Sequence, residues 1–255
     1  MKVGIAGCGA IGSEVARAAS TMEDVKALVL YDVDPDATAL LAGLPKAQVV
    51  ADPAALLAGS DLVVECAHKG VVQTIVLDAL KAGKHAMVLT VGALADAGLR
   101  EALLAAARAN GCKLYVPSGA VMGIDGIKAA AQGDLKSVTL VTNKPPAGLD
   151  KPVDRWTMLF NGPASQAVGE FPKNVNVAAA LALAGLGFED TWVQVAVDPL
   201  ATRNSHKVIV EGDFGRARIE VENQPSPTNP KTSYLASLSA IALLRRIVSP
   251  LEVGA

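Results

Sequence analysis

Three glycines near the start of the chain have the spacing G-x-G-x-x-G, over residues 7–12. An apolar, strand-like run precedes them, and a helical pattern follows at once. The first glycine permits a tight turn, the second lets the backbone approach a bound group, and the third lets helix and strand pack closely. The N-terminus of the helix offers unpaired N–H groups to an anion. The pattern therefore predicts a phosphate-binding turn, with an ordinary strand–helix turn as the alternative.

Asp32 ends the second strand-like run, 20 residues after Gly12. A carboxylate at this place accepts hydrogen bonds from the ribose hydroxyls of a dinucleotide. No Lys or Arg lies between Val33 and Asp36, so a 2′-phosphate would meet repulsion. We therefore expect NAD in preference to NADP, although a rotated carboxylate would admit NADP. The residues expected to bind it are Gly7, Gly9, Ala10, Ile11, Gly12 and Asp32.

The three histidines have different sequence contexts. Ala67 and His68 follow an apolar strand, at the edge where ligands of open parallel sheets bind. Both are candidates for cofactor contact, with a surface loop as the alternative. His206 begins a later strand and shares a face with two valines, which fits either a catalytic or a buried structural histidine. His85 follows a helix C-terminus and is expected to be structural.

Further polar residues stand at the start of expected helices. The segment FPKNVNVAA (171–179) precedes an alanine-rich helix, and NPKTSYLASLS (229–239) opens the last helix. Side chains there could hold a carboxylate or a carboxamide, or could simply cap the helices. The segment SGAVMGIDGI (118–127) is glycine-rich and permits close backbone approach. These segments supply the candidates Lys173, Asn174, Asn176, Lys231 and Thr232.

Composition and charge exclude several classes of protein. Hydrophobic residues make up 51% and charged residues 19% of the 255-residue chain, which argues against disorder. The net charge of -2 does not favour nucleic acid or an anionic membrane as a partner. The three cysteines lack a CxxC spacing, so neither a metal site nor a disulfide framework is expected. With neither a signal peptide nor a membrane span recognisable, a cytoplasmic protein is expected.

The elements expected around these residues divide the chain into two domains. Up to about residue 122, apolar strands alternate with helices, which predicts a doubly wound parallel sheet of the Rossmann type. Residues 123–230 predict an α+β domain with a mainly antiparallel sheet, including a hairpin over 206–223. The final amphipathic helix, 231–248, is expected to pack back on the first domain.

Six segments together resemble the L-aspartate dehydrogenase family. They are VGIAGCGAIG, VVECAH, VPSGAVMGIDGI, FPKNVNVAA, SHKVIVEGDFG and NPKTSYLASLS, and they span nearly the whole chain. The resemblance implies oxidation of L-aspartate to iminoaspartate, which hydrolyses to oxaloacetate and ammonia or feeds the synthesis of NAD. It also implies a homodimer, use of NAD or NADP, catalysis by His206, and cofactor contacts at Ala120 and Asn176.

The chemistry expected from this resemblance needs a group that handles protons. Hydride leaves only a neutral amine, so a base must act, and an imidazole titrates in the right range. His206 could instead activate water or hydrogen-bond a substrate carboxylate. Two other functions remain open: a related reductase acting on dihydrodipicolinate or homoserine semialdehyde, and a dinucleotide sensor without catalysis.

Overall fold

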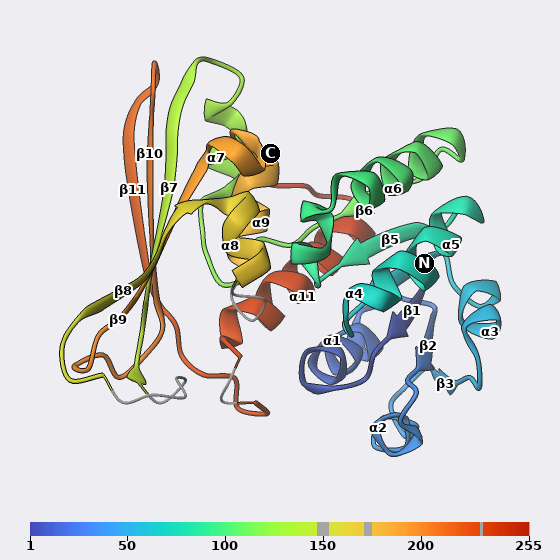
Figure 1. Ribbon diagram of the computed structural model, residues 1–255. Coiled ribbons are helices and arrows are strands. Elements are labelled where there is room, and N and C mark those ends of the chain that lie inside the picture. The colour runs from blue at the N-terminus through green and yellow to red at the C-terminus, as the bar shows by residue number, and fades with distance from the viewer. Residues whose placement is uncertain (147–152, 171–174, 230–231, 255) are drawn as a thin grey trace. The chain divides into compact units, whose positions relative to one another are not determined.

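A computed structural model describes residues 1–146, 153–170, 175–229 and 232–254. The chain divides into two compact units. Unit 1 comprises Met1–Pro117 and Ser237–Val253, and unit 2 comprises mainly Ser118–Ala236. Each unit has its own sheet (Figure 1).

Unit 1 is built on a six-stranded parallel sheet of order β3-β2-β1-β4-β5-β6. Its central strands are buried on both faces, which explains their continuous apolar sequences. The order reverses next to β1, and ligands of such sheets bind at this switch point. The strands are β1 (Lys2–Ala6), β2 (Ala27–Tyr31), β3 (Ala47–Val49), β4 (Leu62–Glu65), β5 (His85–Val88) and β6 (Leu114–Tyr115).

Helices follow the strands of unit 1 (Figure 1). The last helix of the chain, α11 (Tyr234–Val248), contributes Ala240 and Leu244 to the same hydrophobic core as Val15 of α1. The other helical segments are α1 (Ala10–Thr21), α2 (Pro35–Ala39), α3 (Pro53–Ala58), α4 (Lys69–Val71), the π-helix Val72–Val76, α5 (Leu77–Lys81), the 3₁₀-helix Val91–Ala95 and α6 (Ala97–Ala109).

Unit 2 has a five-stranded sheet of order β11-β10-β7-β9-β8. Only β7 and β9 pair in parallel, and the other neighbours are antiparallel. The last two strands form a hairpin in which Gly212 is opposite Gly215. The strands are β7 (Leu135–Lys144), β8 (Thr157–Pro163), β9 (Thr191–Val197), β10 (Ser205–Gly212) and β11 (Gly215–Glu222).

The helices of unit 2 cover one face of this sheet (Figure 1). Alternate residues of β7 and β10, such as Leu140 and Val208, pack there against Leu181 of α9. The helix α9 is apolar around its circumference, as expected for a helix inside a core. The helices are α7 (Ile124–Ala130), α8 (Ala164–Glu170), α9 (Val175–Ala184) and α10 (Gly187–Asp190).

The architecture confirms the predicted fold class, with two strands added. Sequence patterns did not predict β3 or β8. The strand β3 is only three residues long, and β8 is an edge strand that ends in Gly162 and Pro163, two residue types that weaken a strand signal.

Among the helices of the described ranges, none has both the length and the apolar sequence that a membrane span requires.

Candidate active site

The glycine-rich turn of unit 1 leads from β1 directly into α1. Gly7 has a φ of +98°, and a Cβ there would lie 2.8 Å from the backbone of Cys66. A Cβ on Gly12 would clash with the carbonyl of Gly7, so a side chain there would push α1 away from the end of β1. A Cβ on Gly9 would meet no described atom within 4 Å. Gly7 and Gly12 are therefore closely surrounded by backbone atoms, whereas the space beside Gly9 is open.

The N-terminus of α1 suits a phosphate group. Its first turn has no acidic residue, and its N-cap residue is Gly9, which has no side chain to accept from the first N–H groups. The first N–H groups of a helix need acceptors and attract negative charge. The residues present fit the pyrophosphate of a dinucleotide, as the glycine spacing predicts.

Asp32 lies beside this turn, directly after β2. Its Oδ2 accepts a hydrogen bond of 2.6 Å from the backbone N–H of Cys8, and its Oδ1 accepts one of 2.9 Å from Asp34. Because carboxylate oxygens have further lone pairs, both can still accept from a ribose. The structure thus places the predicted ribose ligand next to the predicted phosphate turn.

Glu65, at the end of β4, is a buried carboxylate that the sequence analysis did not single out. Its Oε1 accepts hydrogen bonds from the N–H of Ala67 at 2.8 Å and from the hydroxyl of Thr90 at 2.7 Å. Its Oε2 accepts one from the N–H of Thr90 at 3.0 Å. Burial raises the pKa of the carboxyl, and these donors oppose the rise. Glu65 therefore ties together the segments that follow β4 and β5. A charged residue in an otherwise apolar strand was the available sequence signal.

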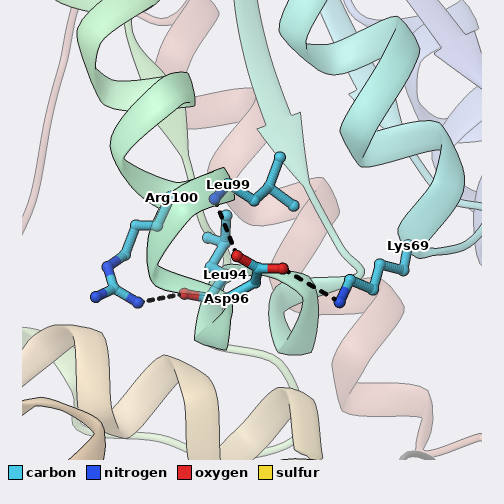
Figure 2. Close-up of polar contacts among 5 residues, drawn as sticks. All are labelled: Lys69, Leu94, Asp96, Leu99 and Arg100. Atoms are coloured by element: carbon cyan, nitrogen blue, oxygen red, sulfur yellow. Dashed lines mark hydrogen bonds and ion pairs between the residues drawn. The ribbon is translucent and has the colours of Figure 1, made fainter.

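Figure 2 shows further contacts of these segments, of which the ion pair between Lys69 and Asp96 joins one segment to the other. Asp96 caps α6 by accepting a hydrogen bond of 3.1 Å from the N–H of Leu99, and it lies 3.6 Å from the ammonium of Lys69. Arg100 donates a hydrogen bond of 2.6 Å to the carbonyl of Leu94. The hydrogen bond from Leu99 and the charge of Lys69 lower the pKa of Asp96. The ion pair of Lys69 with Asp96, between two partly exposed side chains, joins α4 to the N-terminus of α6.

Ala67 and His68 are exposed at this edge. The Nδ1 of His68 accepts a hydrogen bond of 3.1 Å from the N–H of Gly70, so the imidazole caps α4. His85 is structural in the same way, because its Nδ1 accepts from the N–H of Lys113 at 3.1 Å.

Burial and the neighbouring Asp32 raise the pKa of Cys8 to about 12, so this thiol is not a nucleophile at neutral pH.

His206 is buried in unit 2, on the face of β10 that packs against the helices. Its side chain is 7% exposed, and its Nδ1 lies 2.9 Å from the Oγ1 of Thr142 on β7. The pairing of β10 with β7 sets these two residues directly opposite each other. Burial, and then the charge of Lys144 two residues further along β7, lower the pKa of His206 to about 4. The imidazole is therefore neutral at neutral pH.

Ala120 belongs to the same hydrophobic core as the strand of His206. Its carbonyl accepts a hydrogen bond of 3.1 Å from the amide of Asn223, a residue with 4% exposure that sequence patterns did not identify. Gly119 and Gly123, on either side, have φ values of +71° and +80°. Both glycines have a backbone conformation that favours glycine, and Ala120 lies between them.

Asn176 lies in the first turn of α9 and is exposed. Thr232 is half-buried, and its N–H donates to the carbonyl of Asn229 at 2.9 Å. Lys173, Asn174 and Lys231 lie outside the described residues. The parts of the chain that the structure describes contain no group of acidic, His or Cys side chains arranged to hold a metal.

Comparisons with protein families match both units. A model described as "Homoserine dehydrogenase, NAD binding domain" matches residues 7–117. A model described as "Aspartate dehydrogenase, C-terminal" matches residues 125–247. The first description fits the phosphate turn and Asp32, which confirms a nicotinamide dinucleotide as cofactor.

Comparisons with whole proteins cover the full length of the chain. The L-aspartate dehydrogenase of Methanosarcina mazei is 48% identical, with 100% of this chain and 99% of that protein covered. The corresponding protein of Bradyrhizobium diazoefficiens is 41% identical, with 100% and 94% covered. A crystal structure of aspartate dehydrogenase from Thermotoga maritima matches with a TM-score of 0.82 at 26% identity, covering 100% of this chain and 99% of that one. A homoserine dehydrogenase from Thiobacillus denitrificans matches at 14% identity with a TM-score of 0.62, covering 97% of this chain and 73% of that one, a likeness of fold alone. The chain therefore belongs to the aspartate dehydrogenase family.

Proposed function

We propose that this protein oxidises L-aspartate to iminoaspartate with NAD or NADP as hydride acceptor. The observation that carries the proposal is the 48% identity to an L-aspartate dehydrogenase over all of this chain. Unit 1 supplies the dinucleotide site and unit 2 the substrate site. A dinucleotide held in unit 1 would supply the nicotinamide that takes up the hydride from the Cα of aspartate. The imine formed then hydrolyses to oxaloacetate and ammonia.

In this proposal Gly7, Gly9, Ala10, Ile11 and Gly12 hold the pyrophosphate and Asp32 holds the ribose. The open space at Gly9 and the uncapped N-terminus of α1 support the first assignment. The absence of Lys and Arg from residues 33–36 supports a preference for NAD. Ala67, His68, Ala120 and Asn176 are further proposed cofactor contacts.

His206 is the proposed catalytic residue. The α-ammonium of aspartate must lose a proton before hydride can leave, and two carboxylates must be held. A neutral, buried imidazole can accept the proton or can donate a hydrogen bond, depending on which ring nitrogen carries hydrogen. Lys173, Asn174, Lys231 and Thr232 are proposed donors to the carboxylates, together with the backbone around Ala120.

Assembly and cellular role are also part of the proposal. The family resemblance supports a homodimer and delivery of the imine to pyridine nucleotide synthesis, in the cytoplasm. Trp192 and Met158 are 42% and 38% exposed. Apolar side chains of this size at a surface fit burial between two copies. Size-exclusion chromatography with light scattering distinguishes a dimer from a monomer.

A substrate panel tests the activity. We expect NAD reduction with L-aspartate and little with D-aspartate, L-glutamate, L-malate or L-homoserine. Activity confined to L-homoserine would assign the protein to a related reductase. Binding of NADH without turnover of any substrate would instead support a dinucleotide sensor without catalysis.

A further inference from the structure

The hydrogen bond between Thr142 and His206 determines more than the position of the ring. Thr142 is 2% exposed, and its hydroxyl contacts Nδ1 of His206 at 2.9 Å. A hydroxyl can donate its own hydrogen to Nδ1, or it can accept a hydrogen that Nδ1 carries. The first arrangement leaves the ring proton on Nε2, and the second leaves Nε2 with a lone pair. The two arrangements give the imidazole opposite roles.

Burial of the hydroxyl distinguishes the two arrangements. Among the residues that the structure describes, Nδ1 of His206 is the one hydrogen-bond partner of the Thr142 hydroxyl. If Nδ1 donated, the O–H of Thr142 would be buried without an acceptor, which costs about 1–3 kcal/mol. If the hydroxyl donates, its hydrogen is satisfied and only a lone pair is left over. The donating hydroxyl is therefore favoured.

We propose that Thr142 is a positioning residue whose hydroxyl donates to Nδ1 and keeps the ring proton of His206 on Nε2, where it serves as a hydrogen-bond donor to a carboxylate of the substrate. The assignment of the proton rests on the structure alone, and the assignment of the substrate rests on the proposed function. Nε2 makes no hydrogen bond within the described ranges, so it is available to a ligand.

This arrangement gives His206 one defined task. A neutral imidazole N–H held in place can bind and polarise an oxygen of the reactant without changing its own charge. The proton that the α-ammonium loses then passes to water, not to Nε2. The neighbouring charge of Lys144 adds attraction for a carboxylate on the same side of the sheet.

Nitrogen NMR of the histidine rings in the ligand-free protein tests the proton position directly. The protein has three histidines, and two provide internal references. His68 and His85 each accept a backbone N–H at Nδ1, so each carries its proton on Nε2 when neutral. The signals of His206 are identified as those that are missing from the spectrum of His206→Gln. We expect them to show the same pattern, with the proton on Nε2. A proton on Nδ1 would overturn the proposal.

Variants at Thr142 test what holds the proton there. Thr142→Val keeps the shape but removes the hydroxyl, so we expect a mixture of both ring forms and a kcat lower by about tenfold. The KM for NAD should not change. Thr142→Ser should restore the wild-type spectrum. Thr139→Val is the matched control, because Thr139 lies on β7 with its side chain on the opposite face. An unchanged His206 spectrum in Thr142→Val would contradict the proposal.

The donor role is tested by comparing two substitutions of His206. The side-chain amide of Gln can place an N–H near the position of Nε2 but cannot act as a base at neutral pH. We expect His206→Gln to keep at least about ten times the kcat of His206→Ala. Equal loss in both variants would exclude the donor role. Absence of aspartate oxidation by the wild-type protein would overturn the proposed function and the substrate assignment, while the NMR result would still decide the role of Thr142.

Discussion

The carboxylate of Asp32 accepts a hydrogen bond of 2.6 Å from the backbone N–H of Cys8. The residue proposed to bind the ribose therefore also holds the turn proposed to bind the pyrophosphate. The ribose and pyrophosphate parts of the proposed site are therefore coupled, because a shift of Asp32 would move the peptide between Gly7 and Gly9.

Cofactor preference should respond to the charge at this position. The double substitution Asp32→Ser, Val33→Arg replaces the repelling carboxylate and adds a cation at a residue that is 86% exposed. Arg pairs with phosphate through two hydrogen bonds. We expect the ratio of kcat/KM for NADPH to that for NADH to rise by about tenfold or more. The single substitution Val33→Arg is the control, and an unchanged ratio in the double variant would remove Asp32 as a selector.

Loss of the Glu65 carboxylate should destabilise the protein. Glu65→Ala leaves the N–H groups of Ala67 and Thr90 without their acceptor, and each such loss costs about 1–3 kcal/mol. Urea unfolding measures the change in the free energy of unfolding. Glu101→Ala, at an exposed position of α6, should be within about 0.5 kcal/mol of wild type. A similarly small effect of Glu65→Ala would show that the contacts of Glu65 contribute little.

Stability should fall in mild acid because of His206. Its pKa is about 4 in the folded protein, against about 6.5 in an unfolded chain. Between these values the unfolded chain binds more protons, so the free energy of unfolding decreases as the pH falls, by about 3 kcal/mol in total. Urea titrations at about pH 7 and about pH 5 should show a smaller decrease in His206→Gln than in wild type. An identical pH dependence in His206→Gln would contradict the lowered pKa.

Removal of the imidazole should separate catalysis from cofactor binding. We expect His206→Ala to lose about 100-fold or more in kcat, the usual effect of removing a catalytic donor or base. Because the residues proposed to bind the dinucleotide do not include His206, the Kd for NADH, measured by fluorescence titration, should stay within about twofold. Near-normal turnover in this variant would exclude His206 from the mechanism.

The strands with a regular hydrophobic pattern were predictable from sequence. Strands buried on both faces, such as β2, and alternating strands, such as β10, have distinct patterns. The alternation also identified the face of His206, because Val208 and Val210 share it. The strand β3 gave no such signal, because only three residues pair and two of them are exposed.

Contacts between distant strands were not predictable in this way. Thr142 and His206 are 64 residues apart in sequence, and they meet because of the register in which β7 and β10 pair. Asn223 and Ala120 are also far apart in sequence, by 103 residues, and their hydrogen bond forms only in the folded chain. No local pattern encodes a register, so the partners of candidate residues required the structure.

Reductive amination is the most direct test of the central claim. The measurement is the near-ultraviolet absorbance of NADH mixed with purified protein, oxaloacetate and ammonium, repeated with NADPH. We predict that NADH is consumed only when both oxaloacetate and ammonium are present, and faster than NADPH. Consumption without ammonium would indicate reduction of the keto acid itself, and no consumption by a protein that binds NADH would contradict the assignment as an aspartate dehydrogenase.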